Sequence, residues 1–552
     1  MSGEMPRVEP HLLTERLAQR ALNTVLWRGG VESLRGASFV KDPVKTGTKL
    51  TIYRDGQHLD DDTRYWLTFN GDVDITRGPV ADDELGRLFY TGDGVPKLTN
   101  SLVGWSEAAA MPLAFYNLGI PAPASPVASV SGTPAVDAEP VSIVVAYAYV
   151  TTDGYVGPLS LGHGPITYSQ GQLLTVSSMQ TGPSGAYNIS HKNVYVSVTD
   201  ADGATALRFW MTANLAASSI NGQLDFTLLG EEADTPSLIA PPADLFGLML
   251  HPNGFLVGFT TRKYCRSEVF KPHGWPSAYQ DPIGPDIVGG AIIGQTVVIC
   301  TKGQTFAATG SDPLNQHISD FAGEQPCVAK RTIRAMPHGV LYASPDGLVL
   351  AGSVSSPLMV VSEAFFTREQ WQAFNPSSMH AVIHDRRYNV FWKVDETHKG
   401  SIIFDFGVDG RIHQVVETDQ WYSAAYTDKR RDEMFVAGAD GFIYKWDAGD
   451  KLTTLWRSRE IRMPRPQNVG AVRIMAKTYP VRFRLYDSRK NEDGEMELRL
   501  MSEVDVTSDR PERLHGSDRC TTIHWEIETT ASWTQVELAS SIYEILKRQG
   551  SG

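Results

Sequence analysis

Short apolar runs separated by polar turns dominate the second half of the chain. The runs cover residues 254–259, 287–299, 339–351, 388–394, 402–406 and 434–446. Turn glycines accompany them at Gly254, Gly303, Gly347 and Gly441, with spacings of 49, 44 and 94 residues, the last being two steps of 47. Short strands joined by turns at a period in the forties are typical of β-propeller blades. The pattern therefore predicts an all-β, propeller-like core.

The first hundred residues also contain strand patterns. We expect strands around an Asp55-Gly56 turn in TIYRDGQHL (51–59), at RYWLTF (64–69) and within RLFYTGDGVPKL (87–98). Ahead of them, residues 11–27 place Leu13, Leu17, Ala21 and Val25 at steps of four. That spacing fits either a short amphipathic helix or an extended arm.

Two proline-rich linkers enclose a separate module. The first is LGIPAPASPVASV (118–130) and the second is TPSLIAPPADL (235–245). Between them, strand-like runs and an Asp202-Gly203 turn predict an inserted β-sandwich. We therefore divide the chain into an N-terminal arm with the first propeller strands (1–118), the inserted sandwich (127–240), the remaining blades (241–465) and a C-terminal β-rich module (466–552) that ends in a short helix.

Composition narrows the function classes. The 552 residues include 63 acids and 50 bases, for a net charge of −13, so tight nucleic-acid binding is not expected. Four cysteines form no CxxC pair and are expected to be buried thiols in a reducing compartment: Cys265, Cys300, Cys327 and Cys520. We expect no signal peptide in MSGEMPRVEP, and no apolar run approaches the roughly 20 residues of a membrane span.

Motifs of common enzymes are missing. The chain has no GxSxG, HExxH, GxxxxGK[ST] or helix-opening GxGxxG motif, and SPDGLVL (344–350) lacks the distal Thr-Trp of a sialidase Asp box. Two acidic runs, Asp60-Asp61-Asp62 and Asp82-Asp83-Glu84, are candidates for paired carboxylates, although solvated turns are the more typical outcome. Asp200 and Asp202 resemble the start of a calcium loop that lacks its final Glu, so a hairpin turn is favoured.

Histidines and basic residues are scattered. His251, His273 and His338 recur near turns without metal-ligand spacing, so we expect hydrogen-bonded loop histidines. The basic run Lys429-Arg430-Arg431 precedes Asp432 and Glu433, which favours a self-compensating turn over a nucleic-acid patch.

Aromatic residues recur near blade boundaries. They are Trp275-Pro276, Trp371, Trp421-Tyr422 and Trp446. Core filling between blades is expected of them, and anchoring of subunit interfaces is the alternative. From the residues alone we predict no catalytic, cofactor or metal site.

Three phrases in a fixed order carry a resemblance. They are SEVFKPHGWPSAY (267–279), DIVGGAIIGQTVVICTKGQTFAATGSDP (286–313) and QPCVAKRTIRAMPHGVLYASPDGLVL (325–350). Together they resemble the nozzle, or tail tubular protein B, family of short-tailed bacteriophages. DVDITRGPVADDELGRLFYTGDGVPKLT (72–99) resembles the phrase before that family's insertion, and WTQVELASSIYEI (533–545) its closing phrase. The insertion, with AYAYVTTDGYVGPLS (146–160), looks like a fibronectin-III-like module.

The resemblance implies a structural, non-enzymatic virion protein of the phage tail, assembled in the host cytoplasm. Such proteins form a ring, usually a homo-hexamer, below the adaptor ring on the portal. The ring continues the DNA channel for genome ejection and anchors fibres, spikes or a distal plug. Six copies would carry about −78 charges, and an acidic wall lets DNA pass without binding it.

Two alternatives remain open. One is a carbohydrate-binding or carbohydrate-cleaving propeller, such as a fibre-like adhesin or glycosidase. It would need a pocket in which acids and aromatic rings converge. The other is an interaction propeller of the WD-repeat kind, for which YKWD (444–447) is the one matching phrase.

Overall fold

The computed structural model describes residues 2–55, 61–106, 111–199, 205–233, 238–490, 496–515 and 518–550. Their regular secondary structure is almost entirely β-strand, which confirms the all-β prediction. The helices among them are α1 (Arg368–Ala373), α2 (Ile542–Gly550) and the 3-10 turns η1 (Ser277–Tyr279), η2 (Lys330–Thr332) and η3 (Pro376–Ser378). Contacts divide the chain into unit 1 (Met1–Asn70, Cys300–Phe306 and Asp320–Gly552) and unit 2 (Gly71–Ile299 and Ala307–Ser319).

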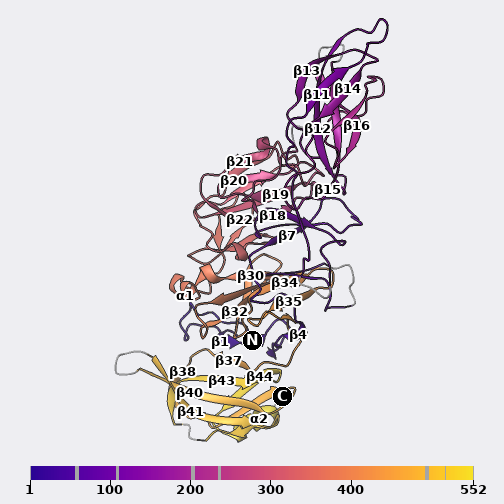
Figure 1. Cartoon of the computed structure of the whole chain (residues 1–552). Coiled ribbons are helices and arrows are strands. Elements are labelled where there is room, and N and C mark those ends of the chain that lie inside the picture. The colour runs from indigo at the N-terminus through magenta and orange to yellow at the C-terminus, as the bar shows by residue number, and fades with distance from the viewer. Residues whose placement is uncertain are drawn as a thin grey trace. The chain divides into compact units, whose positions relative to one another are not determined.

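Unit 1 contains sheets built on antiparallel pairs of consecutive strands, as in propeller blades (Figure 1). The first is β26 (Arg334–Met336), β27 (Gly339–Ala343), β28 (Leu348–Ala351) and β29 (Met359–Val360). The second, β30 (His380–His384), β31 (Arg387–Lys393), β32 (Lys399–Phe406) and β33 (Ile412–Thr418), forms one end of a ten-stranded sheet. The third is β34 (Ala424–Asp428), β35 (Glu433–Ala437), β36 (Ile443–Lys445) and β4 (Ser38–Lys41). A hairpin of β5 (Thr51–Arg54) and β6 (Trp66–Phe69) accompanies them.

The N-terminal segment completes sheets formed by distant parts of the chain. Strand β4 pairs antiparallel with β36, with Tyr444 opposite Phe39. A late blade therefore takes its fourth strand from the start of the chain.

Residues 11–27 are not helical. They contain β1 (Ala18–Leu22) and β2 (Thr24–Val25), which pairs with β3 (Glu32–Ser33). Strand β1 lies between β33 and β37, and its Ala18 and Ala21 are fully buried. The helical alternative is wrong because the two neighbouring strands satisfy the backbone groups of β1, and small side chains permit the close packing. Tertiary pairing overrides a local period of four.

The C-terminal module packs two sheets around a tryptophan cluster. Its strands are β37 (Thr454–Ser458), β38 (Ile461–Gln467), β39 (Ala471–Ala476), β40 (Val481–Lys490), β41 (Met496–Val506), β42 (Glu512–Arg513), β43 (Cys520–Thr529) and β44 (Trp533–Ala539). The rings of Trp456, Trp525 and Trp533 lie 4.9–6.1 Å apart at their centroids. Helix α2 follows, as predicted.

Unit 2 carries further sheets of the blade type. One is β7 (Asp74–Arg77), β8 (Leu88–Thr91), β9 (Lys97–Thr99) and β10 (Tyr116–Asn117). Another is β18 (Phe246–Leu250), β19 (Leu256–Phe259), β20 (Lys263–Arg266) and β21 (Gln280–Pro282). Most of a third also belongs here: β22 (Ile287–Ile293), β23 (Thr296–Thr301), β24 (Phe306–Thr309) and β25 (His317–Asp320).

The inserted module of unit 2 is a sandwich of two antiparallel sheets (Figure 1). One sheet has the order β11 (Val127–Ser131), β14 (Leu173–Ser177), β17 (Ile220–Gln223). The other has the order β13 (His163–Tyr168), β12 (Val141–Thr151), β15 (Ile189–Thr199), β16 (Thr205–Asn214). Alternate residues of both sheets, such as Val176 and Val194, fill a shared core. The Asp202-Gly203 turn lies outside the described residues, but β15 and β16 do pair antiparallel.

The turn glycines lie between consecutive antiparallel strands, as predicted. Gly303, Gly347 and Gly441 each follow the second strand of a blade, whereas Gly254 follows the first strand of its blade. The 49-residue spacing therefore separates a turn between the first and second strands of one blade from a turn between the second and third strands of another. Gly441 needs its glycine, because its φ is +86° and a Cβ there would meet the Gly47 carbonyl oxygen at 2.7 Å.

Candidate functional site

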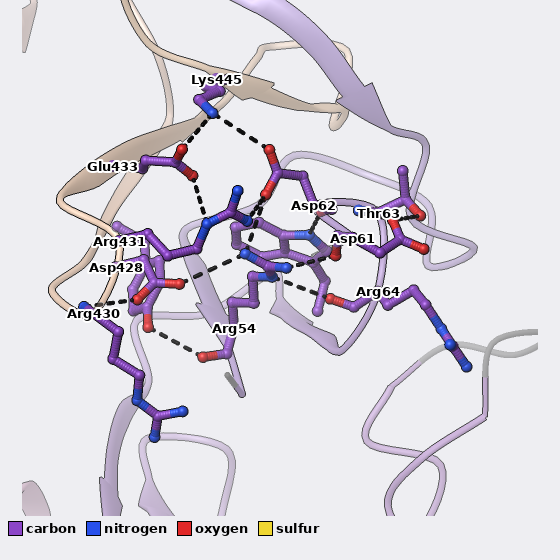
Figure 2. Close-up of polar contacts among 12 residues, drawn as sticks. Arg54, Asp61, Asp62, Thr63, Arg64, Asp428, Arg430, Arg431, Glu433 and Lys445 are labelled. Carbon is purple, nitrogen blue, oxygen red and sulfur yellow. Dashed lines mark hydrogen bonds and ion pairs between the residues drawn. The ribbon is translucent and has the colours of Figure 1, made fainter. Parts of the chain in front are cut away.

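Two charged runs that are far apart in the sequence meet in unit 1 (Figure 2). Asp62, from the first acidic run, forms ion pairs with Arg431 and with Lys445, the latter at 3.5 Å. Glu433 also pairs with both cations, with its carboxylate 3.3 Å from Arg431 Nε and 2.6 Å from Lys445 Nζ. The acidic and basic runs therefore neutralise each other.

Arg54 is the buried centre of this cluster. Its side chain is 0% exposed, and its guanidinium lies 3.3 Å from Asp62 and 3.6 Å from Asp428. It also lies 6.0 Å from the Trp66 ring and 5.9 Å from the Phe435 ring. Because a buried guanidinium needs carboxylates around it, the cluster holds the β5–β6 hairpin against β34 and β35. The carboxylates of Asp62 and Asp428 are thus both engaged in ion pairs.

The rest of the first acidic run forms a turn. Asp61 accepts hydrogen bonds from the backbone N–H of Thr63 at 2.9 Å and from its hydroxyl, and these bonds lower the pKa of Asp61. Asp60 lies outside the described residues.

The second acidic run supports a pocket in unit 2. The Asp83 carboxylate accepts hydrogen bonds from Arg87 Nε at 2.8 Å and from the Arg87 backbone N–H at 2.9 Å. The Arg87 guanidinium lies 5.1 Å from the centre of the Tyr155 ring, within cation–π range. Asp82 and Glu84 are exposed. Within this run, Asp83 therefore acts by positioning a cation behind an aromatic ring.

His273 forms one wall of the pocket together with Tyr155. Their ring centroids are 4.6 Å apart, and His273 Nε2 lies 3.0 Å from the Val156 carbonyl oxygen. A carbonyl oxygen only accepts, so Nε2 carries the proton and Nδ1 keeps a lone pair. Nδ1 is buried and has no hydrogen-bond partner among the described residues. Burial lowers the pKa of His273 to about 4, which keeps the ring neutral.

Another part of the lining comes from the outer face of the sandwich. Tyr195 of β15 lies opposite Phe209 of β16, with ring centroids 6.1 Å apart. The segment after Gly230 extends this face, because the Phe209 N–H donates to the Glu231 carbonyl oxygen at 2.9 Å. The pocket has a volume of about 620 Å³, and Asn193, Lys271 and Glu232 complete its polar lining.

These pocket residues could not be found from sequence motifs. Tyr155, Tyr195, Phe209 and Glu231 are spread over 77 residues and belong to different strands and turns. The available signal was the alternation of aromatic residues on the strands of the insertion. Of the residues singled out from sequence, Asp83 and His273 contribute to this pocket.

The remaining predicted residues have structural surroundings. His251 is buried, stacks on Phe255 and lies 3.1 Å from the Gln295 carbonyl oxygen through Nε2. His338 is exposed. Cys265, Cys300, Cys327 and Cys520 are buried free thiols, as predicted. Asp200 and Asp202 lie outside the described residues.

The tryptophans mostly fill cores, as predicted. Trp275 and Trp371 are fully buried, and their indole N–H groups donate to the carbonyl oxygens of Pro272 and Ser344, both at 2.9 Å. Trp446 packs against Phe391. Trp421 differs because two ammonium groups, those of Lys393 and Lys399, lie 5.0 and 5.5 Å from its ring.

In the part of the chain that the structure describes, no His, Cys, Asp or Glu side chains gather into a metal-binding group. The same residues include no helix with the length and apolarity needed to cross a membrane.

No family model and no curated protein matches this chain. Solved structures that it resembles include the extracellular domain of a putative hybrid two-component system from B. thetaiotaomicron, at 9% identity and a TM-score of 0.25. That match covers 67% of this chain, which spans only 45% of the other protein. Another is a glycoside hydrolase family 43 arabinoxylan arabinofuranohydrolase from Bacillus subtilis, at 10% identity and a TM-score of 0.19, covering 67% of this chain and 93% of the enzyme. At such TM-scores neither likeness bears on function.

Proposed function

We propose that this chain is a structural virion protein of a phage tail. In this proposal it forms a ring below the portal and adaptor, where it continues the DNA channel and anchors fibres or a distal plug. The observation that carries the proposal is the order of three phrases at 267–279, 286–313 and 325–350, which resembles the nozzle family.

The positions of these phrases support the proposal. The first contains the buried Trp275, the second runs through β22 to β24, and the third runs through η2 to β28 with the buried Cys327. The phrases thus coincide with strands, turns and core positions of blade sheets. A family likeness in these phrases is a likeness of scaffold, and the function of such a scaffold arises through assembly.

Charge supports the same proposal. A channel that carries DNA should not bind its phosphates, and the chain has a net charge of −13. The basic run at 429–431 includes Arg431, which is paired with Asp62 and Glu433 inside its own unit. This cation is therefore unavailable as a phosphate contact.

Assembly provides the test. The purified full-length chain, alone and with the adaptor protein of the same phage, is measured by native mass spectrometry and negative-stain microscopy. We expect a closed ring with a central channel and a mass near six chains. A chain that stays monomeric in both samples would refute the proposal. Incubation of the same preparation with bacterial polysaccharides tests the alternative of a glycosidase, for which release of new reducing ends is the expected signal.

A further inference from the structure

The pocket of unit 2 has the features of a built ligand site. Its lining combines aromatic rings with polar groups, and its volume of about 620 Å³ lies within the roughly 300–1,000 Å³ typical of small-molecule sites. The lining residues belong to unit 2. We infer that this pocket binds a saccharide ring without cleaving it, an activity that does not depend on the proposed tail function.

The sandwich wall presents two rings and a carboxylate in one row. Tyr195 lies opposite Phe209 in the β15–β16 ladder. The next segment is antiparallel, with Glu232 bridged to Arg208, so Glu231 lies across from Phe209. Residues directly opposite each other in a ladder share a face of the sheet. Tyr195, Phe209 and Glu231 therefore follow one another on the face that lines the pocket.

This row matches the chemistry of a sugar. A pyranose ring has apolar C–H faces and a rim of hydroxyl groups. The C–H faces pack against flat aromatic rings, which bury much area at little entropic cost because they have few rotatable bonds. A carboxylate accepts hydrogen bonds from two neighbouring hydroxyls, and Asn193 adds both a donor and an acceptor.

His273 adds an acceptor from another part of the lining. Its Nε2 is engaged with the Val156 carbonyl oxygen, while its buried Nδ1 has no partner among the described residues. A buried acceptor without a donor is costly, and a ligand hydroxyl would satisfy it. The ring is held in place by Tyr155, behind which lies the Arg87 guanidinium that Asp83 orients.

The lining favours binding over hydrolysis. Glycoside hydrolysis by the common mechanism requires two facing carboxyl groups about 5–9.5 Å apart. Of the described residues that line the pocket, Glu231 and Glu232 carry carboxylates, and they are consecutive in an extended segment. Because both come from one short segment, they do not lie on opposite sides of a bound ring, as the two carboxyl groups of that mechanism must.

The test uses the full-length protein with five disaccharides, built from glucose, galactose, mannose, rhamnose or N-acetylglucosamine. Saturation-transfer NMR and calorimetry are expected to show binding of at least one sugar, with a Kd on the order of 1 mM or tighter. Phe209→Ala and Glu231→Gln should each weaken that sugar about tenfold. Glu139→Gln, an exposed acid of the same module outside the pocket lining, is the matched control and should bind as the parent does.

Folding of each variant is checked by its melting curve. If Phe209→Ala unfolds, Phe209→Leu replaces it, because leucine keeps an apolar side chain without a flat aromatic face. The inference is overturned if no sugar binds at 10-fold the expected Kd. It is also overturned if the pocket variants bind like Glu139→Gln, or if the protein releases new reducing ends. Ring assembly by microscopy is a separate readout, so failure here and failure of the tail proposal can be told apart.

Discussion

Arg54 offers a direct test of what stabilises unit 1. Its fully buried guanidinium contacts Asp428, whose side chain is 4% exposed, and Asp62, which is 24% exposed. Replacement of Arg54 by Met keeps an apolar stem against Trp66 and Phe435 but removes the charge. Breaking a buried ion pair from one side costs about 3–5 kcal/mol, because the other charge stays buried without compensation.

The surroundings place the expected cost near the lower end of that range. Asp62 keeps its pairs with Arg431 and Lys445, so it is not orphaned. Asp428 keeps one hydrogen bond, from the Arg430 backbone N–H at 3.1 Å. We therefore expect Arg54→Met to destabilise unit 1 by about 3 kcal/mol, and Arg54→Met with Asp428→Asn to recover part of the loss because the buried charge is removed.

Urea unfolding followed by tryptophan fluorescence measures the effect, and hydrogen exchange of peptides from β5, β6, β34 and β35 locates it. The midpoint should fall by on the order of 1 M for Arg54→Met. Arg430→Met, an exposed cation of the same cluster, is the matched control and should cost less than about 0.5 kcal/mol. Equal midpoints for the Arg54 and Arg430 variants would refute the assignment of Arg54 as the buried centre.

Three further outcomes follow from other features of unit 1. Burial and then the Glu417 carboxyl raise the pKa of Glu4. The stability that its protonated form contributes is fully present below about pH 4.5 and is lost by the time the pH has risen through the raised value. Between these two limits Glu4→Gln, which stays neutral, should become more stable relative to the parent by up to about 1.4 kcal/mol per pH unit, and parallel pH–stability curves over that range would contradict this. Gly441→Ala should destabilise the protein more than Gly29→Ala. Both glycines have φ near +90°, but only at Gly441 would a Cβ lie 2.7 Å from a carbonyl oxygen. Equal melting temperatures for the two variants would contradict this steric argument. Trp371→Ala should cost about 3–5 kcal/mol in urea unfolding because the indole is fully buried and bonded to Ser344, and a shift below 1 kcal/mol would show that the site collapses around the change.

Much of the architecture follows from local patterns. Alternating apolar residues and turn glycines were enough to predict hairpins at Gly254, Gly303, Gly347 and Gly441, because a hairpin is specified by residues next to one another. The C-terminal strands and α2 were predictable for the same reason. Residues 11–27 were ambiguous. A period of four in small and branched residues fits a helix, but it also fits a strand that is paired on both sides.

The candidate sites depended on contacts between distant residues. The acidic run at Asp61 and Asp62 and the basic run at Arg430 and Arg431 each looked like an isolated solvated turn. The structure brings them together around Arg54, which no sequence pattern had singled out. The unit 2 pocket likewise joins His273 to Tyr195 and Phe209 from another module of that unit.

The sequence by itself determined the strand-forming pattern, the acidic balance and the ordered phrases that resemble a phage tail family, because these properties reside in neighbouring residues and in composition. The tertiary structure alone decided that β4 completes a late blade, that Arg54 is the centre of a charge cluster, and that Tyr155, His273, Phe209 and Glu231 share a pocket. The physical reason is that strand pairing and side-chain convergence depend on which distant backbone segments pack together. The backbone N–H and C=O groups along a strand edge are the same in every strand, so they do not specify which strand will pair with them.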